Sequence, residues 1–340
     1  MVQKSLSQPT EWLKGSVIGS GSFGTVHLAI DSSTGALFVA KSAKSEPGIK
    51  SLKNEADILE KLDFSPHVIK CMGKDVAFAK NGETRFSLFF EYMAGGSLSD
   101  VAQKFGGKLN EKLIRLYTRE ILRGLKHLHD NGIVHSDVKC KNVLLGASGA
   151  VKLADFGCAK RLSGCKNGSM GGTPLWMAPE VLRNEGLGFA ADIWSLGCTV
   201  IEMATGRPPW GGDVADNPMG VMLMIAKGNG VPDFPRDFSD EGLDFLSRCL
   251  DRDPVNRWTS EKLLDHPFVA TGKMAVSPTS VLDVASYESD GDDDDDDDGD
   301  LLCDDEVDFV GKFPFMEKWC FKEKKVFLEG TDDWITVRSR

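Results

Sequence analysis

The chain has 340 residues, of which 41% are hydrophobic and 27% are charged, a composition typical of a soluble globular protein. The first residues lack the apolar stretch of a secretory signal, and no window approaches the length of apolar chain that spans a bilayer. A secreted protein and a transmembrane protein are therefore not expected. The formal net charge is −11.

The charge is distributed unevenly. Residues 271–340 carry 20 acidic and 8 basic residues, whereas residues 1–270 carry 31 acidic and 32 basic ones. A nearly neutral domain followed by an acidic tail argues against general nucleic-acid binding, which needs a basic surface. The eight cysteines include no C-x-x-C pair, so we expect reduced thiols in a cytoplasmic or nuclear protein.

After a short N-terminal extension, residues 1–11, the first part of the chain is predicted to be rich in strands. Strand-like runs occupy residues 16–19, 25–30, 37–42 and 86–93. Between the last two runs, Leu52, Ala56, Leu59 and Leu62 recur at helical spacing and predict a helix over residues 51–62.

Beyond residue 97 the pattern becomes helical. One helix is predicted over residues 113–129, with Leu113, Leu116, Ile121, Leu125 and Leu128 on one face. Short strands at 143–145 and 151–155 precede helices at 191–206, 242–250 and 260–268. The layout predicts an α+β fold with a small β-rich lobe, about residues 12–93, and a larger α-helical lobe, about residues 94–268.

The chain changes character after residue 268. Residues 269–300 form a polar linker that ends in an aspartate run, which we expect to be solvated and disordered because its charges repel each other. The run lacks the spaced ligand loop of an EF-hand, which argues against calcium binding. Residues 301–340 are rich in Phe and Trp and contain strand-like runs at 325–330 and 333–339, so we expect this segment to dock and to have a regulatory role.

A glycine-rich motif opens the chemistry of the chain. Gly19, Gly21, Gly24 and Val26 form the pattern G-x-G-x-x-G-x-V, which by itself also occurs in dinucleotide-binding folds. In those folds a helix and then an acidic residue follow the glycines, whereas here a strand follows and then Lys41. The glycines are therefore predicted to form a turn between two strands that covers phosphates.

Lys41 ends an apolar run and is predicted to point into the interface between the lobes. Glu55, on the following helix, is its candidate anionic partner. The alternative, an ordinary surface lysine, is disfavoured by the motifs that follow. In "HSDVKCKN", Asp137 can accept a hydroxyl proton and Lys139 can neutralise a transferring phosphate.

Two further side chains complete a phosphoryl-transfer pattern. Asn142 and Asp155, the latter in "LADFG", supply oxygen ligands for a metal ion, and "GTPLWMAPE" closes a segment of about twenty residues after Gly157. Phosphoryl transfer needs such groups because negative charge spreads over oxygens in its transition state. These motifs occur in the right order and at the right spacing, which is specific for this chemistry.

On these motifs, residues 12–268 resemble a complete eukaryotic Ser/Thr protein kinase domain. The stretches "GTPLWMAPEV" and "DIWSLGCTVIEMATGRPPW" are similar to those of MEKK-type MAP kinase kinase kinases. The acidic tail and the closing "DWITVRSR" resemble a plant subgroup linked to abscisic-acid and stress signalling. The resemblance implies that the chain phosphorylates MAP kinase kinases with ATP and Mg²⁺, and that the tail has a regulatory partner.

The resemblance also implies roles for individual residues. Asp137 is the catalytic base, assisted by Lys139, Asn142 and Lys41, and Mg²⁺ is held by Asn142 and Asp155. Phe90 is the gatekeeper of the adenine slot, and Lys139 with Thr173 marks a Ser/Thr kinase. Two structural roles are also implied: Glu180 pairs with Arg257, and Asp192 anchors the catalytic loop. The residues implied in binding ATP are Ile18, Gly19, Ser20, Gly21, Ser22, Phe23, Gly24, Val26, Val39, Lys41, Glu55, Glu91, Met93, Leu144 and Asp155.

Two positions depart from the family pattern. Val39 stands where the family usually has Ala, and its larger side chain is expected to tighten or distort the adenine slot. Ser136 replaces the Arg that binds a phosphorylated residue of the activation segment, and a serine cannot make that bidentate contact. We therefore expect that phosphorylation of Ser163, Ser169 or Thr173 does not act through residue 136, and that abundance, the tail or partners set activity.

Three histidines and one cysteine could suggest a metal site or a reactive thiol, but they have simpler explanations. His127, His129 and His135 lack partners at zinc-ligand spacing, so His135 is expected to pack in the core and the other two to lie on a helix surface. Cys158 is either a reactive thiol beside the ATP site or, as we favour, a small structural residue. Two alternatives to the assigned function remain open: a Ser/Thr kinase of another signalling family, and a pseudokinase scaffold.

Overall fold

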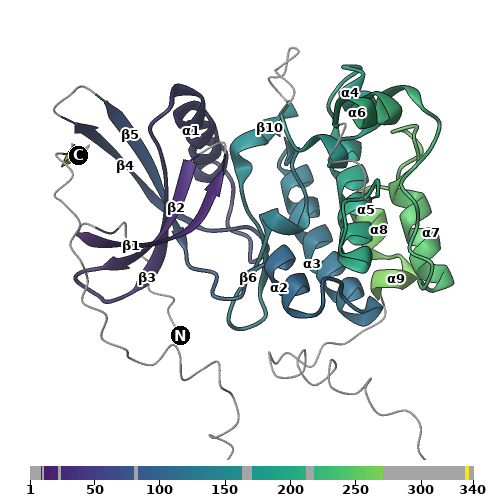
Figure 1. Ribbon diagram of the computed structural model, residues 1–340, viewed down its shortest axis with the longest axis horizontal. Coiled ribbons are helices and arrows are strands. Elements are labelled where there is room, and N and C mark those ends of the chain that lie inside the picture. The colour runs from purple at the N-terminus through teal and green to yellow at the C-terminus, as the bar shows by residue number, and fades with distance from the viewer. Residues whose placement is uncertain are drawn as a thin grey trace, which may run out of the picture.

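A computed structural model describes Pro9 and residues 11–21, 24–79, 83–162, 171–211, 218–270 and 334–336. Its two lobes lie side by side, a strand-rich lobe with one long helix and a helical lobe (Figure 1). The predicted α+β fold with a β-rich N-lobe and an α-helical C-lobe is confirmed. Within the described residues, no helix combines the length and the apolarity needed to cross a membrane.

The N-lobe is built on an antiparallel sheet with the strand order β1-β2-β3-β5-β4-β11. Its strands are β1 (Trp12–Gly21), β2 (Gly24–Asp31), β3 (Leu37–Ala43), β4 (Cys71–Ala79), β5 (Thr84–Glu91) and β11 (Trp334–Thr336). Strand β4 was not predicted from the sequence. The predicted strand-like run 333–339 contains β11, which pairs with Ala77–Ala79 at the edge of the sheet. The run 325–330, the aspartate run and Ser163 and Ser169 lie outside the described residues.

Alternation along β3 separates the two faces of this sheet. Lys41 lies opposite Val26 of β2 and Leu88 of β5, and Val39 lies opposite Phe90. Because successive side chains of a strand point to opposite faces, Lys41 faces inward, toward α1. On the outer face, Phe38 makes edge-to-face contacts with Trp12 and Phe89 in a separate small core.

Helix α1 (Glu46–Glu60) packs on the inner face of the sheet and begins five residues earlier than predicted. The Ser45 side chain accepts the N–H of Gly48 and so caps the helix, and a proline lies in the first turn, where its missing N–H costs nothing. The buried face of α1 includes Leu52, Ala56 and Glu55. Glu55 is a charged residue on that apolar face, which requires a partner.

The C-lobe is assembled around α3 (Glu111–Asp130) and α5 (Phe189–Thr205), which pack against each other. Most of α5 is buried, including Trp194, so its sequence reads as apolar on all sides. The other helices are α2 (Leu98–Lys104), α4 (Pro179–Leu182), α6 (Pro218–Lys227), α7 (Asp240–Cys249), α8 (Ser260–Leu264) and α9 (Pro267–Ala270). The predicted helix 260–268 is thus two short helices.

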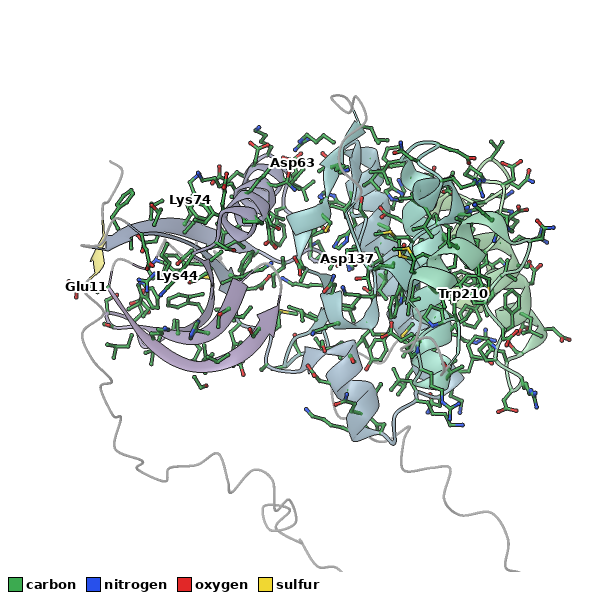
Figure 2. The ribbon with its side chains drawn as sticks, turned by 45° about the horizontal axis from the view of Figure 1, so that its top comes forward. Glu11, Lys44, Asp63, Lys74, Asp137 and Trp210 are labelled. Atoms are coloured by element: carbon green, nitrogen blue, oxygen red, sulfur yellow. The ribbon has the colours of Figure 1, made fainter. Side chains whose placement is uncertain are left out.

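Short strands line the C-lobe where it meets the N-lobe. They are β6 (Gly96–Ser97), β7 (Ile133–Val134), β8 (Val143–Leu145), β9 (Val151–Leu153) and β10 (Lys160–Arg161), with the 3₁₀ turns η1 (Cys140–Asn142), η2 (Phe156–Cys158) and η4 (Pro174–Trp176) between and after them. The loops that join β7 to β8 and follow β9 carry the predicted phosphoryl-transfer residues. Asp137 accordingly lies where the two lobes meet (Figure 2).

Candidate active site

Lys41 connects three elements at the interface between the lobes. Its ammonium lies 2.7 Å from Glu55 Oε2 on α1 and 2.9 Å from Asp155 Oδ1, which precedes η2. The other oxygen of Glu55, Oε1, accepts the backbone N–H of Phe156 at 3.0 Å. The structure therefore brings Lys41 together with its predicted partner Glu55 and with the predicted metal ligand Asp155. The contact between Lys41 and Asp155 was not indicated by the sequence.

Burial and charge act against each other in this group. Burial disfavours the ammonium of Lys41, but the adjoining carboxylates of Glu55 and Asp155 outweigh it and raise the lysine pKa. Burial likewise disfavours the Asp155 carboxylate, but Lys41 outweighs it and lowers the pKa of Asp155. Lys41 and Asp155 are consequently both charged at neutral pH, as binding of a polyphosphate and a metal requires.

The segment after Asp155 is fixed tightly to α1. Asp155 has a left-handed backbone, with φ 65°, which turns its side chain toward Lys41. Asn54 Nδ2 lies within 3.3 Å of three carbonyl oxygens, those of Phe156, Gly157 and Ala159. A Cβ at Gly157 would lie 2.3 Å from Ser51 Oγ, so a larger residue there would force the Ser51 hydroxyl to rotate away.

The catalytic loop forms a compact polar group around Asp137, which is only 5% exposed. Asp137 Oδ2 accepts hydrogen bonds from Lys139 Nζ and from Asn142 Nδ2, both at 2.8 Å. Asp137 Oδ1 accepts the hydroxyl of Thr173 at 2.6 Å, and the same hydroxyl accepts Lys139 Nζ at 2.5 Å. The group thus presents a carboxylate oxygen to a hydroxyl with an ammonium beside both.

Asp192 of α5 holds the backbone of this loop, as predicted. Its two carboxylate oxygens accept the N–H of His135 at 2.9 Å and that of Ser136 at 2.8 Å. Ser136 has a left-handed backbone, with φ 67°, and its buried hydroxyl has no hydrogen-bond partner in the part of the chain that the structure describes. Ser136 therefore contributes to the loop through its backbone N–H, and its side chain makes no hydrogen bond with the described residues.

The prediction that His129 lies on a helix surface is wrong. Its side chain is 8% exposed, and its ring contacts Asp192 Oδ2 at 3.0 Å and Ser260 Oγ at 3.2 Å. The reason is tertiary, because the last turn of α3 is covered by α5 and α8. His135 is fully buried and contacts the Ala154 carbonyl, as expected for a packing residue.

The end of the activation segment is fixed at two points. The guanidinium of Arg257 makes two hydrogen bonds with Glu180, of 2.6 and 2.8 Å, so the predicted pair is present. At the other point, Gly172 has φ 124°, and a Cβ there would lie 2.4 Å from the Ser136 carbonyl oxygen. Glycine at this position therefore allows the segment to approach the catalytic loop and place Thr173 on Asp137.

The apolar side chains expected to contact adenine come from both lobes. Val26, Val39 and Leu144 are half-buried, whereas Met93 and the gatekeeper Phe90 are 8% and 6% exposed. Ile18, on β1, is 49% exposed. Partly exposed apolar side chains of this kind suit a flat heterocycle.

The glycine-rich turn is described at its two ends. Ser20 and Gly21 end β1 and Gly24 begins β2, with Gly19 opposite Val26, so the predicted turn between two strands is present. Gly24 has φ 146°, and a Cβ there would lie 2.4 Å from the Ser42 carbonyl oxygen. Ser22 and Phe23 lie outside the described residues.

Glu91 has a role that the sequence did not indicate. Its side chain accepts the backbone N–H of Lys70 at 2.7 Å and lies 2.6 Å from Lys152 Nζ, so it ties the connection between the lobes to β9. Only its backbone is then available to contact adenine.

Glu202 of α5 is another residue whose role the sequence did not indicate. Its side chain accepts the N–H of Cys140 and the indole N–H of Trp176, both at 3.1 Å.

The donor set fits a hard metal ion. Asn142 Nδ2 is occupied by Asp137, which leaves the amide oxygen to act as a ligand, and the Asp155 carboxylate is 31% exposed. Mg²⁺ is typically held by one or two such oxygens together with substrate phosphates and water. No group of three or more His, Cys, Asp and Glu side chains suited to a metal occurs among the described residues, and such a magnesium site does not need one.

Cys158 has the properties of a structural residue. Burial, together with the nearby carboxylates of Asp137 and Asp155, raises the pKa of its thiol to about 11. Because the thiolate is the reactive form, the raised pKa makes this thiol a weak nucleophile at neutral pH. This favours the structural alternative over a reactive thiol.

Known proteins identify the family to which this arrangement belongs. The protein kinase domain family matches residues 12–269. "Mitogen-activated protein kinase kinase kinase 17" of Arabidopsis thaliana is 38% identical over 97% of this chain and 93% of its own length. "Mitogen-activated protein kinase kinase kinase 18" of the same plant is 38% identical over 96% of this chain and 99% of its own length. "Mitogen-activated protein kinase kinase kinase 20", also from Arabidopsis thaliana, is 41% identical over 76% and 78%. The chain therefore belongs to the protein kinase family and is a Ser/Thr protein kinase of the MAP kinase kinase kinase type.

Proposed function

We propose that this kinase transfers the γ-phosphate of Mg²⁺-bound ATP to Ser and Thr residues in the activation segment of MAP kinase kinases. One observation carries the chemistry: Asp137 Oδ1 holds an aliphatic hydroxyl, that of Thr173, at 2.6 Å, with Lys139 Nζ next to it. A substrate hydroxyl at the same carboxylate can give up its proton while the lysine offsets the charge of the incoming phosphate.

Each end of the nucleotide has candidate partners. Lys41 is the cation for the phosphates and is held in place by Glu55, and the backbone of Gly19, Gly21 and Gly24 would cover the phosphates. Asn142 and Asp155 are the residues that would hold Mg²⁺, which neutralises phosphate charge when bound. The family as a whole uses ATP and Mg²⁺, and the donor set described above supports the same requirement here.

The names of the relatives support the choice of substrate, because a MAP kinase kinase kinase acts on a MAP kinase kinase. The test uses purified MAP kinase kinases whose own catalytic Asp is replaced, so that incorporated phosphate comes from this chain. We expect phosphorylation of their activation segments at a rate at least tenfold above that of a generic protein substrate. Asp137→Asn is the matched inactive control. Equal rates on both substrates would contradict the proposed substrate class, and no difference from Asp137→Asn would contradict the activity.

We propose that activity does not depend on a phosphate in the activation segment. Ser136 carries no charge and contributes its backbone to Asp192, so it cannot bind a phosphate as the usual arginine does. Phosphatase treatment followed by removal of the phosphatase should leave activity within about twofold. Loss of activity that a single segment phosphate restores would contradict this view.

We further propose a role in stress or abscisic-acid signalling, in the cytoplasm, the nucleus or both. The support is the likeness of the acidic tail and of "DWITVRSR" to a plant subgroup with that role. Kinase activity recovered from plant cells before and after abscisic acid should rise with the hormone, and a fluorescent fusion should locate the chain. Unchanged activity across hormone, salt and drought treatments would remove the signalling proposal.

A further inference from the structure

The outer face of the N-lobe sheet contains a pocket of about 410 Å³. Ala40 and Ser42 of β3 line it, and they flank Lys41, which points the other way. Strand alternation therefore places this pocket on the face of the sheet opposite Lys41. Thr25 and His27 of β2 also line it, and it meets the site described above only at the ends of the glycine-rich turn, Gly21 and Gly24.

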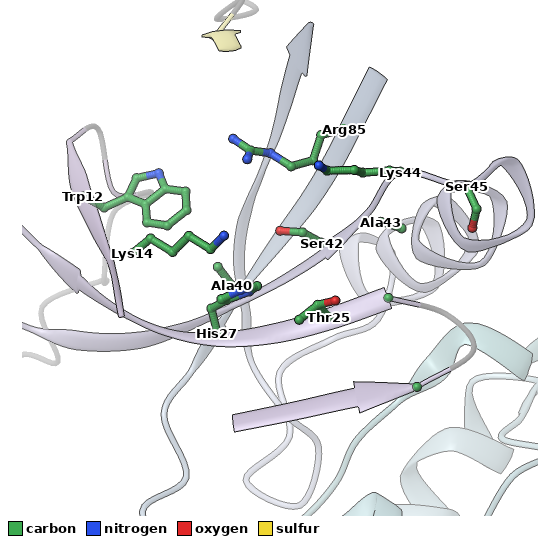
Figure 3. A pocket seen from close by; sticks show the side chains of 12 residues that line it. Trp12, Lys14, Thr25, His27, Ala40, Ser42, Ala43, Lys44, Ser45 and Arg85 are labelled. Atoms are coloured by element: carbon green, nitrogen blue, oxygen red, sulfur yellow. The ribbon is translucent and has the colours of Figure 1, made fainter. Parts of the chain in front are cut away.

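The lining of this pocket is cationic. Lys14, Lys44 and Arg85 contribute to it, and its described lining includes no Asp or Glu. Figure 3 shows Arg85 and Lys44 extending toward the strand that carries Trp12 and Lys14. Burial and the neighbouring Lys14 and Arg85 lower the pKa of His27, as expected where positive charges gather. The chemistry of the lining suits a carboxylate-rich ligand.

The chain itself carries a carboxylate-rich segment of this kind. Residues 290–308 include thirteen Asp and Glu and no Lys or Arg. This segment lies between α9, in the C-lobe, and β11, which is on the N-lobe sheet (Figure 1). The sequence therefore has to pass from one lobe to the other before it reaches β11.

The pairing of β11 brings the end of the tail to the pocket. Thr336 lies opposite Ala77 of β4, and Ala77 lies opposite Arg85 of β5. At about 4.8 Å between neighbouring strands, Thr336 is about 10 Å from the strand position of Arg85. Residues 309–333 span up to about 80 Å when extended, so chain length does not prevent the acidic segment from reaching the pocket.

We propose that the pocket on the outer face of the N-lobe sheet binds the chain's own acidic segment, residues 290–308. Tethering through β11 raises the local concentration of this segment, which compensates for the weakness of each exposed ion pair. Gly21 and Gly24 at the ends of the glycine-rich turn line the pocket, as does Ser45, which caps α1. The bound segment would thus contact the elements that place Lys41 and Glu55.

A carbodiimide that joins carboxylates directly to amines tests this in the full chain. Mass spectrometry should find Lys14 and Lys44 joined to residues 290–308 at least fivefold more often than the exposed Lys53 and Lys227. Arg85→Glu should lower the yield at Lys14 at least threefold without removing the amine. Lys53→Glu, which changes the net charge equally, should leave that yield unchanged.

Two further measurements keep the test decisive. If Arg85→Glu lowers the melting temperature, a salt series on the unaltered chain replaces this variant as the test. Raising the salt from 0.05 to 0.5 M should then reduce the yield of the Lys14 cross-link. Mixing heavy- and light-isotope chains separates joining within a chain from joining between two copies. Equal yields at all lysines, linkage only between copies, or linkage only to carboxylates outside 290–308 would each overturn the proposal.

Discussion

The Thr173 hydroxyl offers a direct test of how the activation segment supports catalysis. It donates to Asp137 Oδ1 at 2.6 Å and accepts from Lys139 Nζ at 2.5 Å. Thr173→Val keeps the size and branching of the side chain and removes both bonds. A hydrogen bond to a charged group contributes about 1.5–3 kcal/mol, and water or substrate can replace part of this, so we expect a net loss of about 2 kcal/mol. That loss corresponds to roughly 30-fold in kcat/KM.

The assay measures phosphate transfer to a generic protein substrate at several ATP concentrations, together with the melting temperature of each variant. Thr173→Ser is the matched control, since it retains the hydroxyl, and it should stay within about threefold of the unaltered chain. A Thr173→Val chain that is folded and within twofold of full activity would refute the reasoning, because the hydroxyl would then contribute nothing to the arrangement of Asp137 and Lys139.

Three further predictions concern stability and reactivity. Arg257→Leu leaves the buried Glu180 carboxylate without its partner and should lower the free energy of unfolding by about 3–5 kcal/mol in a urea titration, whereas a loss below 1 kcal/mol would contradict the role of the pair. Ser136→Gly should raise the free energy of unfolding by about 1 kcal/mol, because glycine adopts a positive φ without strain. Gly172→Ala should lower the free energy of unfolding, because the added Cβ meets the Ser136 carbonyl oxygen. A less stable Ser136→Gly chain or a more stable Gly172→Ala chain would contradict the backbone conformations described here. The pKa of Cys158 is about 11 against an ordinary value of 9.0, so this thiol should react with iodoacetamide at pH 7.4 about 100-fold more slowly than an ordinary thiol. Its rate of labelling should rise with pH up to about pH 11. Fast labelling at pH 7.4 would show that the thiol is exposed.

Residues that belong to one motif of the sequence remain close together in the structure. The spacing from Asp137 to Asn142 is set by one loop and one 3₁₀ turn, so neighbouring residues in the sequence remain neighbours in space. The contacts that the sequence did not indicate join distant segments. His129 meets Asp192 across 63 positions, and Lys41 meets Asp155 across 114. Nothing in the surroundings of either residue along the chain indicates such a partner.

Two missed elements have different causes. In β4, Gly73, Lys74 and Asp75 interrupt the apolar alternation, and the strand forms because β5 supplies its hydrogen-bonding partner, with a register shift at Gly73. In α6 the sequence is apolar on all sides and lacks a helical period, and Met219, Leu223 and Met224 are in fact 47–65% exposed. A stretch such as α6, which is apolar on every side, has no helical period by which it can be identified.

The position of β11 also affects how the protein behaves in concentrated solution. An unpaired strand edge presents N–H and C=O groups that can pair with another chain and lead to aggregation. By pairing with Ala77–Ala79, β11 occupies that part of the β4 edge with a strand of the same molecule. A chain that ends at residue 270 would lack this cover. We expect such a chain to associate through β4 at concentrations at which the full chain remains dispersed.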